Sequence, residues 1–482
     1  MKAKAAALEA DYVVVGCGAS GMAFADALVA NGDASVIMID RHARPGGHWN
    51  HAYPFVRLHL PSHMYGVNSR VLGDQTVYRT GHNRGLLHVA SASEILTYYE
   101  RVMEEVLLAS GRVVYLPMSS FEPDGCVTSR LTGVRRTVRV RQKLVDATYG
   151  EARVPSTHLR PFSVAPDVTC VPISALASAS TPYRRYCVIG GGKTGMDACS
   201  WLLENGVAGE RIHWIVPRDA WWMNRAKLQF TRDYFESSMD FASYQMEAVA
   251  QAKNADDLFL RFEARQLCFR LDPQIQPTMY HGATATISEL NALRQIENVV
   301  RMGHVTSIER DRVTLDGGTI QLPEDTLYVD CSAAGIPVNP PVSIFERTKI
   351  RLQWVKPTRP VFSAALIGCV EAMFDDDGRK NELCTPMSPP REPADWLKTL
   401  AISMKNQRAW ALEPRLMDWI KACRLDPATH LAGSVKDGDE SARRLLDRLR
   451  RATETGAANL EALMRLGDFE ACRPKVKSKA AR

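Results

Sequence analysis

The chain has 482 residues, of which 45% are hydrophobic and 24% are charged, a composition typical of a globular protein with two or three domains. The formal charge of +6 is concentrated at residues 473–482, which hold five basic residues and no acid. We therefore predict a basic disordered tail there and no nucleic-acid binding. No apolar run reaches the roughly 18 residues of a membrane span, and the N-terminal residues lack a signal-peptide core, so we predict no membrane association.

The 11 cysteines are scattered, and no two of them have C-x-x-C spacing. This pattern favours a reducing cytoplasm and argues against a flavoenzyme that works through two neighbouring thiols. The histidine pairs His48/His51 and His59/His63 have spacings known from metal sites, but no cysteine or acid cluster accompanies either pair. We therefore predict no metal.

The stretch from Asp11 to Asn50 predicts a dinucleotide-binding unit. A strand at 12–15 leads into a Gly16-x-Gly18-x-x-Gly21 turn, a helix follows to about residue 30, and a second strand ends on Asp40. Such a turn brings the backbone close to a pyrophosphate, and the helix N-terminus attracts its charge. A carboxylate at the position of Asp40 can accept the hydroxyls of an adenosine ribose. The alternative is a glycine turn that serves only helix–strand packing.

A second unit begins near Tyr183. A strand at 186–189 is followed by Gly190-x-Gly192-x-x-Gly195, a helix at 196–205 and a strand at 212–216. This last strand is followed by Arg218 instead of an acid, and an arginine can bind a 2′-phosphate bidentately. We therefore interpret the first unit as a site for FAD and the second as a site for NADPH. The alternative is that Arg218 is a surface residue.

Periodicity and turn residues predict the other elements. They are a helix over 91–110 opened by a Ser91–Glu94 capping box, antiparallel strands over 127–147, a largely helical region over 226–300 with a capped helix at 286–298, a hairpin over 303–322, strands over 326–332 and 361–367, and helices over 396–406, 415–423, 441–454 and 459–466. We expect the last two helices to form a hairpin around Gly456, packed on the body of the protein or on another subunit as a homodimer.

Several motifs together resemble the class B flavin-dependent monooxygenases, which include flavin-containing and Baeyer–Villiger monooxygenases. The motifs are the two glycine turns, Gly46-Gly47-His48-Trp49, the segment from Tyr53 to Tyr65, Val216-Pro217-Arg218, and the links at 146–150 and 330–335. The resemblance covers residues 10 to 370. It implies bound FAD, NADPH as the reductant, and O2 activated as a C4a-(hydro)peroxyflavin that oxidises a small organic substrate at a heteroatom or at carbon.

The predicted fold is α/β, with two Rossmann-like domains and a helical C-terminal extension. The FAD domain is discontinuous, at 1–160 and 326–400, with the NADPH domain and its helical insert at 161–325 between its parts. A helical region at 401–472 and the tail at 473–482 follow. The predicted cofactor-binding residues are Gly16, Gly18, Ala19, Ser20, Gly21, Asp40, Arg41, Gly47, His48 and Trp49 for FAD, and Gly190, Gly192, Lys193, Thr194, Gly195, Arg218 and Gly335 around NADPH and the second link.

The candidate catalytic residues are Trp49, Arg57 and His59, which we expect near the flavin and nicotinamide. Trp49 can instead be a packing residue, and His59 a loop histidine bonded to backbone. Two departures from the family pattern bear on the reaction: residues 162–168 lack the glycine and histidine of the F-x-G-x-x-x-H fingerprint, and His59 replaces an acid. Ketone-to-ester oxidation is therefore not our prediction. A flavin reductase or dehydrogenase that inserts no oxygen, and a non-catalytic redox sensor, are the alternative functions.

Overall fold

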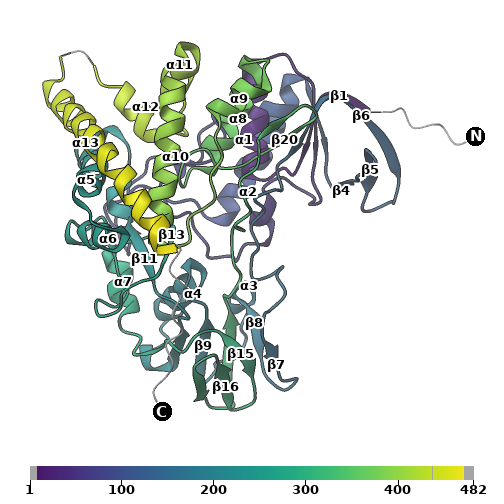
Figure 1. The fold of residues 1–482 in the computed structure, drawn as a ribbon. Helices are drawn as coiled ribbons and strands as arrows, with labels where there is room; N and C mark the ends of the chain where they lie inside the picture. The colour runs from purple at the N-terminus through teal and green to yellow at the C-terminus, as the bar shows by residue number, and fades with distance from the viewer. Residues whose placement is uncertain (1–7, 437, 472–482) are drawn as a thin grey trace, which may run out of the picture.

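The computed structural model describes residues 8–436 and 438–471. It contains two α/β units and a helical region from the insert and the C-terminal part, which lies along one side of the molecule (Figure 1). The two predicted Rossmann-like units and the helical C-terminal region are present. In the described residues, no helix combines the length and the apolar character needed to cross a bilayer. The predicted tail at 473–482 lies outside them.

The first sheet is built from two separate parts of the chain. Its strand order is β19-β20-β6-β1-β2-β3, and β1 pairs in parallel with both β2 and β6. These strands are β1 (Leu8–Val15), β2 (Val36–Ile39), β3 (Val113–Leu116), β6 (Arg135–Asp146), β19 (Phe345–Glu346) and β20 (Lys349–Arg351). β4 (Ser119–Phe121) and β5 (Cys126–Ser129) extend this sheet, and β5 pairs antiparallel with β6, as predicted for the 127–147 region.

Two apolar helices pack against each other beside this sheet: α1 (Ala19–Asn31) and α8 (Pro360–Met373). The predicted strand at 361–367 is therefore wrong. Residues 361–371 are all buried, so the apolar run shows no helical periodicity to distinguish it from a buried strand. Gly368 allows the contact, because a β-carbon there would lie 2.5 Å from the backbone oxygen of Phe24.

A further helix of the first unit begins at the predicted capping box, in which Ser91 and Glu94 satisfy each other's backbone N–H groups. This helix, α2 (Ala92–Val102), continues through a π turn at Met103–Leu107 and a 3-10 turn at Leu108–Ser110. The prediction of a helix over 91–110 is confirmed.

The second sheet is parallel, with strand order β14-β10-β9-β18-β8. The strands are β8 (Cys170–Pro172), β9 (Arg185–Ile189), β10 (Ile212–Ile215), β14 (Asn298–Val300) and β18 (Thr326–Asp330), and the helices beside them are α3 (Ile173–Leu176) and α4 (Lys193–Glu204). Because β18 pairs with β9, this sheet extends beyond the expected domain boundary at residue 325.

A small sheet lies next to the second unit and contains the predicted hairpin. β16 and β17 pair around Asp316 and Gly317, as expected, and β15 and β7 continue the sheet. Its strands are β7 (Ser163–Val164), β15 (Val305–Ile308), β16 (Arg312–Leu315) and β17 (Gly318–Gln321).

The region over 226–300 is only partly helical. It contains α5 (Phe235–Gln251), α6 (Ala255–Ala264) and α7 (Ile287–Leu293), together with β12 (Cys268–Phe269) and β13 (Met279–Ala285), which form a three-stranded sheet with the preceding β11 (Ala220–Asn224). The capping box of Thr286 and Glu289 is confirmed, but α7 ends at Leu293 and β14 begins at Asn298, where we expected the helix to end.

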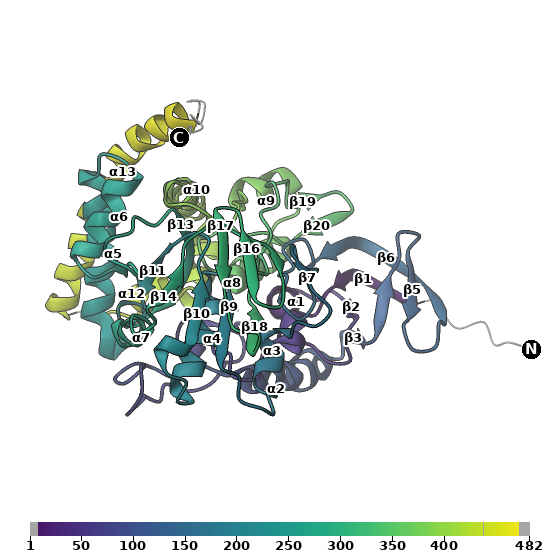
Figure 2. The ribbon, with the colours of Figure 1, turned by 90° about the horizontal axis from the view of Figure 1, so that it is seen from below.

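The C-terminal helices are α9 (Asp377–Leu383), α10 (Pro393–Ala411), α11 (Pro414–Ala422), α12 (Pro427–Gly433) and α13 (Glu440–Ala471). The predicted hairpin around Gly456 is wrong, because α13 is one continuous helix that runs along α5 (Figure 2). Gly456 marks a close approach between these helices, since a β-carbon there would lie 2.7 Å from the backbone oxygen of Met246. The helix packs on its own chain, so a homodimer through it stays a prediction.

Candidate functional site

The first glycine turn has the geometry that an anion-binding helix N-terminus needs. Gly16 has φ +100°, and a β-carbon on Gly21 would lie 2.0 Å from the oxygen of Gly16, so both positions require glycine. Gly18 is the N-cap of α1, and no side chain caps the helix. The backbone N–H groups of Ala19 and Ser20 are therefore available for a bound phosphate.

Beside this turn lies a cavity of about 400 Å³. It is lined by Gly16, Gly18, Ala19, Ser20, Asp40, Arg41, Gly47 and His48 among the predicted residues, by the link at 147–152, and by Phe121, Ile336, Trp354, Pro360, Met387 and Pro389. The structure thus brings most of the predicted FAD residues to one cavity. The cavity extends from the carboxyl end of β2 to the N-terminus of α8 and has a predominantly apolar far end.

Asp40 lines the cavity and is 5% exposed. Its Oδ2 accepts a hydrogen bond of 2.6 Å from the backbone N–H of Cys17, and its Oδ1 accepts from the backbone and the ring of His42. A carboxylate has about four acceptor positions, so these bonds leave room for one ribose hydroxyl and not for the pair that the sequence suggested. The His42 ring also lies 3.0 Å from His51 Nε2, a link between these histidines that spacing alone does not reveal.

His48 and Trp49 differ in their relation to the cavity. His48 lines it, and burial lowers the pKa of its imidazole to about 4, so this side chain is neutral at pH 7. Trp49 is not among the lining residues and packs between the cores of the two units. This position favours the packing role that we held as the alternative for Trp49.

The second glycine turn repeats the first. Gly190 has φ +133°, and a β-carbon on Gly195 would lie 2.0 Å from the oxygen of Gly190. Gly192 caps α4 without a side-chain cap, and a β-carbon there would meet nothing within 4 Å. The space above Gly192 and next to Thr194 can therefore admit a ligand. Gly335, in the second link, has φ +67° and bonds through its backbone to Arg153.

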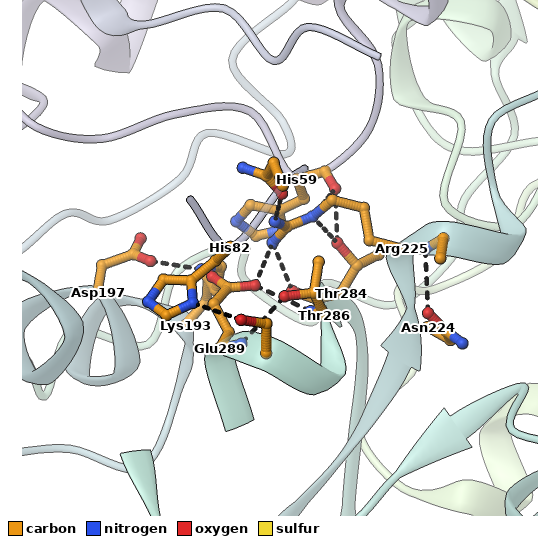
Figure 3. Close-up of polar contacts among 12 residues, drawn as sticks. His59, His82, Lys193, Asp197, Asn224, Arg225, Thr284, Thr286 and Glu289 are labelled. Carbon is orange, nitrogen blue, oxygen red and sulfur yellow. Dashed lines mark hydrogen bonds and ion pairs between the residues drawn. The ribbon is translucent and has the colours of Figure 1, made fainter. Parts of the chain in front are cut away.

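Lys193 is not the free phosphate ligand that we expected. Its ammonium group contacts the carboxylate of Asp197 and lies 3.2 Å from Glu289 Oε1 (Figure 3). Glu289 also pairs with Arg225 at 3.1 Å, and Arg225 is 3% exposed. Although burial opposes it, the two cations hold the pKa of the Glu289 carboxyl at about 2. The charge of Lys193 is thus compensated inside the protein, because two acids from outside the glycine turn come together around it.

His59 lies at this charged cluster, as expected for a residue between the two units. Its backbone oxygen accepts hydrogen bonds from Arg225 Nε at 3.0 Å and from Thr284 Oγ1 at 2.5 Å. Burial, together with the charge of Lys193, lowers the pKa of its imidazole to about 4. The ring is therefore neutral at pH 7, and the backbone of His59 is fixed by Arg225 and by Thr284 of the insert.

Arg57 is placed elsewhere. It is exposed and donates a hydrogen bond of 3.1 Å to the backbone oxygen of Val89, with a longer contact to the Tyr78 hydroxyl. It does not line the cavity. We therefore remove Arg57 from the catalytic candidates, because its guanidinium group ties one surface loop to another.

Arg218 is exposed just after β10, at the position where the first unit has its acid. Two other basic residues, His281 and Arg391, lie close to Arg218. Burial, together with the charges of Arg391 and Arg218, lowers the pKa of the His281 imidazole. Arg391 donates to the backbone oxygens of Ala334, at 3.2 Å, and Ile336. No motif pointed to His281 or Arg391, because they come from the insert and from the C-terminal part, far from the glycine turn in sequence.

Comparisons with known proteins agree with the first of these units. The family described as NAD(P)-binding Rossmann-like domain matches residues 14–69. Among solved structures, the chain is similar to an oxidized steroid monooxygenase bound to NADP (14% identity, 76% of this chain and 84% of the other, TM-score 0.48). It is also similar to cyclohexanone monooxygenase from Rhodococcus sp. Phi1 bound to NADP+ (13% identity, 76% and 84%, TM-score 0.47).

Much more similar in sequence are proteins of mycobacteria. Uncharacterized protein Rv2000 of Mycobacterium tuberculosis (strain ATCC 25618 / H37Rv) is 45% identical over 423 residues, which are 87% of this chain and 78% of the relative. Uncharacterized protein Mb2023 of Mycobacterium bovis matches to the same extent. This identity and coverage show that the chain belongs to the family of these mycobacterial proteins.

Proposed function

We propose that this protein is an FAD-dependent, NADPH-consuming oxidoreductase, a divergent flavin monooxygenase of class B type that hydroxylates a small organic substrate with O2. One observation carries the proposal. The chain contains two uncapped glycine turns, of which the first opens into a cavity with Asp40 at its edge and the second is followed by Arg218. An acid suits a free ribose and an arginine suits a 2′-phosphate, so the two units are suited to different dinucleotides.

The residues around the cavity fit FAD. The free N–H groups of Ala19 and Ser20 would hold the diphosphate, and Asp40 would accept one ribose hydroxyl. The apolar end near Pro360 and Met387 would take the ring system. When bound, FAD would supply the redox chemistry, hydride acceptance from NADPH and reaction with O2, and the residues of the chain would bind and orient the reactants and exclude water.

Around Arg218, a second arginine, Arg391, gives an excess of positive charge that fits an anion. Arg391 is held by the two backbone oxygens after β18. Burial and the charges of both arginines lower the pKa of His281 to about 4, so its imidazole is neutral at pH 7 and offers hydrogen bonds only. A 2′-phosphate would compensate this charge. The open position at Gly192 would let the pyrophosphate approach α4.

His59 would act as a neutral hydrogen-bonding group. A histidine with a pKa of about 4 carries no charge at pH 7, and one ring nitrogen donates while the other accepts. The bonds from Arg225 and Thr284 fix its backbone, so the insert would position His59 against a reactant.

This protein would work in a reducing cytoplasm, a proposal supported by the fact that Cys17 and the nine other cysteines described are all free.

We expect the purified protein to be yellow and to oxidise NADPH much faster than NADH. Arg218→Ala should remove this preference, with about a tenfold or greater loss in kcat/KM for NADPH and little change for NADH, because a charged hydrogen bond to the 2′-phosphate disappears. Steady-state kinetics with both nucleotides measures the effect. Arg310→Ala, which removes an exposed arginine between β15 and β16, is the control. An unchanged preference in Arg218→Ala would remove Arg218 from the site.

Stopped-flow spectroscopy separates oxygen insertion from simple reduction. Protein reduced with NADPH is mixed with O2, and the near-ultraviolet absorbance is followed. A monooxygenase gives a transient absorbance before oxidised flavin returns. Direct return to oxidised flavin with stoichiometric peroxide would instead support a reductase, and protein that takes up no FAD would defeat both enzyme proposals and leave the redox sensor.

A further inference from the structure

Arg359 is a half-buried arginine that has no ion-pair partner in the described part of the chain. It immediately precedes α8, and Pro360, which follows it, lines the apolar end of the cavity. Among the described residues, no acid forms an ion pair with Arg359, and its guanidinium group donates no hydrogen bond. The carbon of its guanidinium group lies over the face of Phe230, 5.8 Å from the ring centroid, a contact that uses none of its N–H groups.

Positive charge exceeds negative charge around Arg359. Asp426, the carboxylate that acts on Arg359 through space, is 1% exposed and pairs with Lys356, and Thr429 also donates to it at 2.7 Å. A third cation, Arg424, donates to the backbone oxygens of His63 and Tyr65 at 2.6 and 2.9 Å, and the described residues give it no ion pair. Burial of a charge without compensation is costly, so a protein retains such a group where a ligand supplies the opposite charge.

The surroundings of Arg359 contain further polar groups without partners. His63 is 8% exposed, and neither of its ring nitrogens makes a hydrogen bond of good geometry. The hydroxyl of Thr231 is also buried and unpaired. Burial lowers the pKa of His63 to about 4 although the backbone oxygen of Phe230 lies close enough to oppose this, and Arg359 and Arg424 add to the effect. Unpaired polar groups at one place indicate a site for a polar ligand.

Backbone strain occurs at the same place. Thr358 has φ +55° and Phe230 has φ +35°, values that branched and bulky side chains rarely adopt. Thr358 is pressed against the insert, because a β-carbon on Gly282 would lie 2.6 Å from its Cγ2. Strain of this kind persists where the surrounding structure fixes a functional position. Here it fixes the residues on both sides of the Arg359 guanidinium group.

We propose that Arg359 binds the carboxylate of an organic acid, which makes the substrate of this enzyme a small anionic molecule. A guanidinium group offers two parallel N–H groups to a carboxylate, and one such anion would neutralise the local charge. The inference rests on the proposed function for its reaction, but the binding site itself stands on the residues around Arg359. The acid would lie next to the apolar end of the cofactor cavity.

Calorimetric titration of the full chain, supplied with FAD, tests the proposal. The probes are benzoate and hexanoate, each compared with its neutral amide. We expect both acids to bind wild-type protein at least about tenfold more tightly than the amides, as expected for charged hydrogen bonds, and Arg359→Met to lose this preference. Arg359→Lys should retain part of it. Arg415→Met, which removes an exposed arginine on α11, should retain all of it.

Denaturant unfolding of the same variants excludes a purely structural role. Loss of an uncompensated charge should leave Arg359→Met as stable as wild type or more stable, whereas an arginine that pairs with Asp426 would destabilise the protein on removal. Equal binding of acids and amides by wild type, no binding of either, or equal binding of acids by wild type and Arg359→Met would overturn the proposal. If NADPH is not oxidised but the acid preference depends on Arg359, the proposed function fails and the binding site stands.

Discussion

Glu289 is a buried carboxylate shared by two cations, Lys193 and Arg225, so its removal has a large expected effect. We predict that Glu289→Gln lowers the free energy of unfolding by about 3–5 kcal/mol at pH 7, because Lys193 and Arg225 lose a buried partner. Urea unfolding measures the change. Glu297→Gln, an exposed glutamate of the same region, is the matched control and should change stability little. A loss no greater than in this control would show that the cluster contributes nothing to the stability of the fold.

Acid should have a corresponding effect. The pKa of Glu289 is about 2 in the folded protein against an ordinary value of 4.5, so its contribution is complete above about pH 4.5 and is lost as the pH falls toward 2. Glu289→Gln should therefore lose stability less steeply over this pH range than wild type does. Parallel curves for the two proteins would contradict the assignment.

The positions of residues that stand at a fixed offset from one turn could be predicted from the sequence. Contacts between residues on distant segments of the chain could not. Asp40 and Arg218 each follow a strand next to a glycine turn, so their positions were predicted. The partner of Lys193 could not be predicted, because Glu289 lies 96 positions after Lys193 in the chain. The spacing of Glu289 from Thr286 indicated only a helix cap. Arg359 gave no signal either, since its lack of a counter-ion is a property of the folded surroundings.

At the level of elements, the contact between α1 and α8 depends on Gly368. We predict that Gly368→Ala lowers the free energy of unfolding by about 1–3 kcal/mol, because a β-carbon 2.5 Å from the Phe24 oxygen forces the helices apart. This loss should exceed the gain of about 1 kcal/mol in helix propensity. Gly433→Ala is the control, since its β-carbon would meet Lys421 only at an ordinary distance of 3.6 Å. Equal stability of both variants in urea would refute the tight contact.

The errors in the predicted elements have one physical origin. Hydrophobic periodicity identifies elements that have one buried side, such as α2, whose capping box and buried positions agreed with expectation. It fails for α8, which is buried all round, and Pro360 at its first turn was the available signal for a helix. In α13 we interpreted Gly456 as the end of one helix and the start of another. The glycine instead permits a close tertiary contact with α5, which local sequence rules cannot predict.

At the scale of the whole molecule, the two units can be tested against each other with one pair of substitutions. Ser20 and Thr194 occupy the same second position of α1 and α4. We predict that Ser20→Glu prevents FAD binding and leaves NADPH binding intact, while Thr194→Glu does the reverse, because a carboxylate there repels a diphosphate. An acid at this position favours the helix itself, so both variants should fold.

Flavin absorbance after gel filtration and fluorescence titration with NADPH measure the two bindings. Loss of both cofactors in both variants would mean that the units do not bind separately, and retention of FAD in Ser20→Glu would show that FAD lies elsewhere.

The two-unit plan could be predicted because each fingerprint is local in sequence. The assignment of β18 to the second sheet could not be, because strand pairing joins residues 326–330 to β9, far away in the chain.

The packing of α13 on α5 has a consequence for the order in which the protein is made. Asn459 bonds to the backbone of Val249, which lies 210 positions earlier, and Leu460 and Leu463 complete the apolar cluster that contains Val249. At synthesis rates of about 5–20 residues per second, α5 leaves the ribosome about 10–40 s before the helix that covers it. During this interval the nascent chain exposes an apolar helix face, so a chaperone that shields it would raise the yield of folded protein.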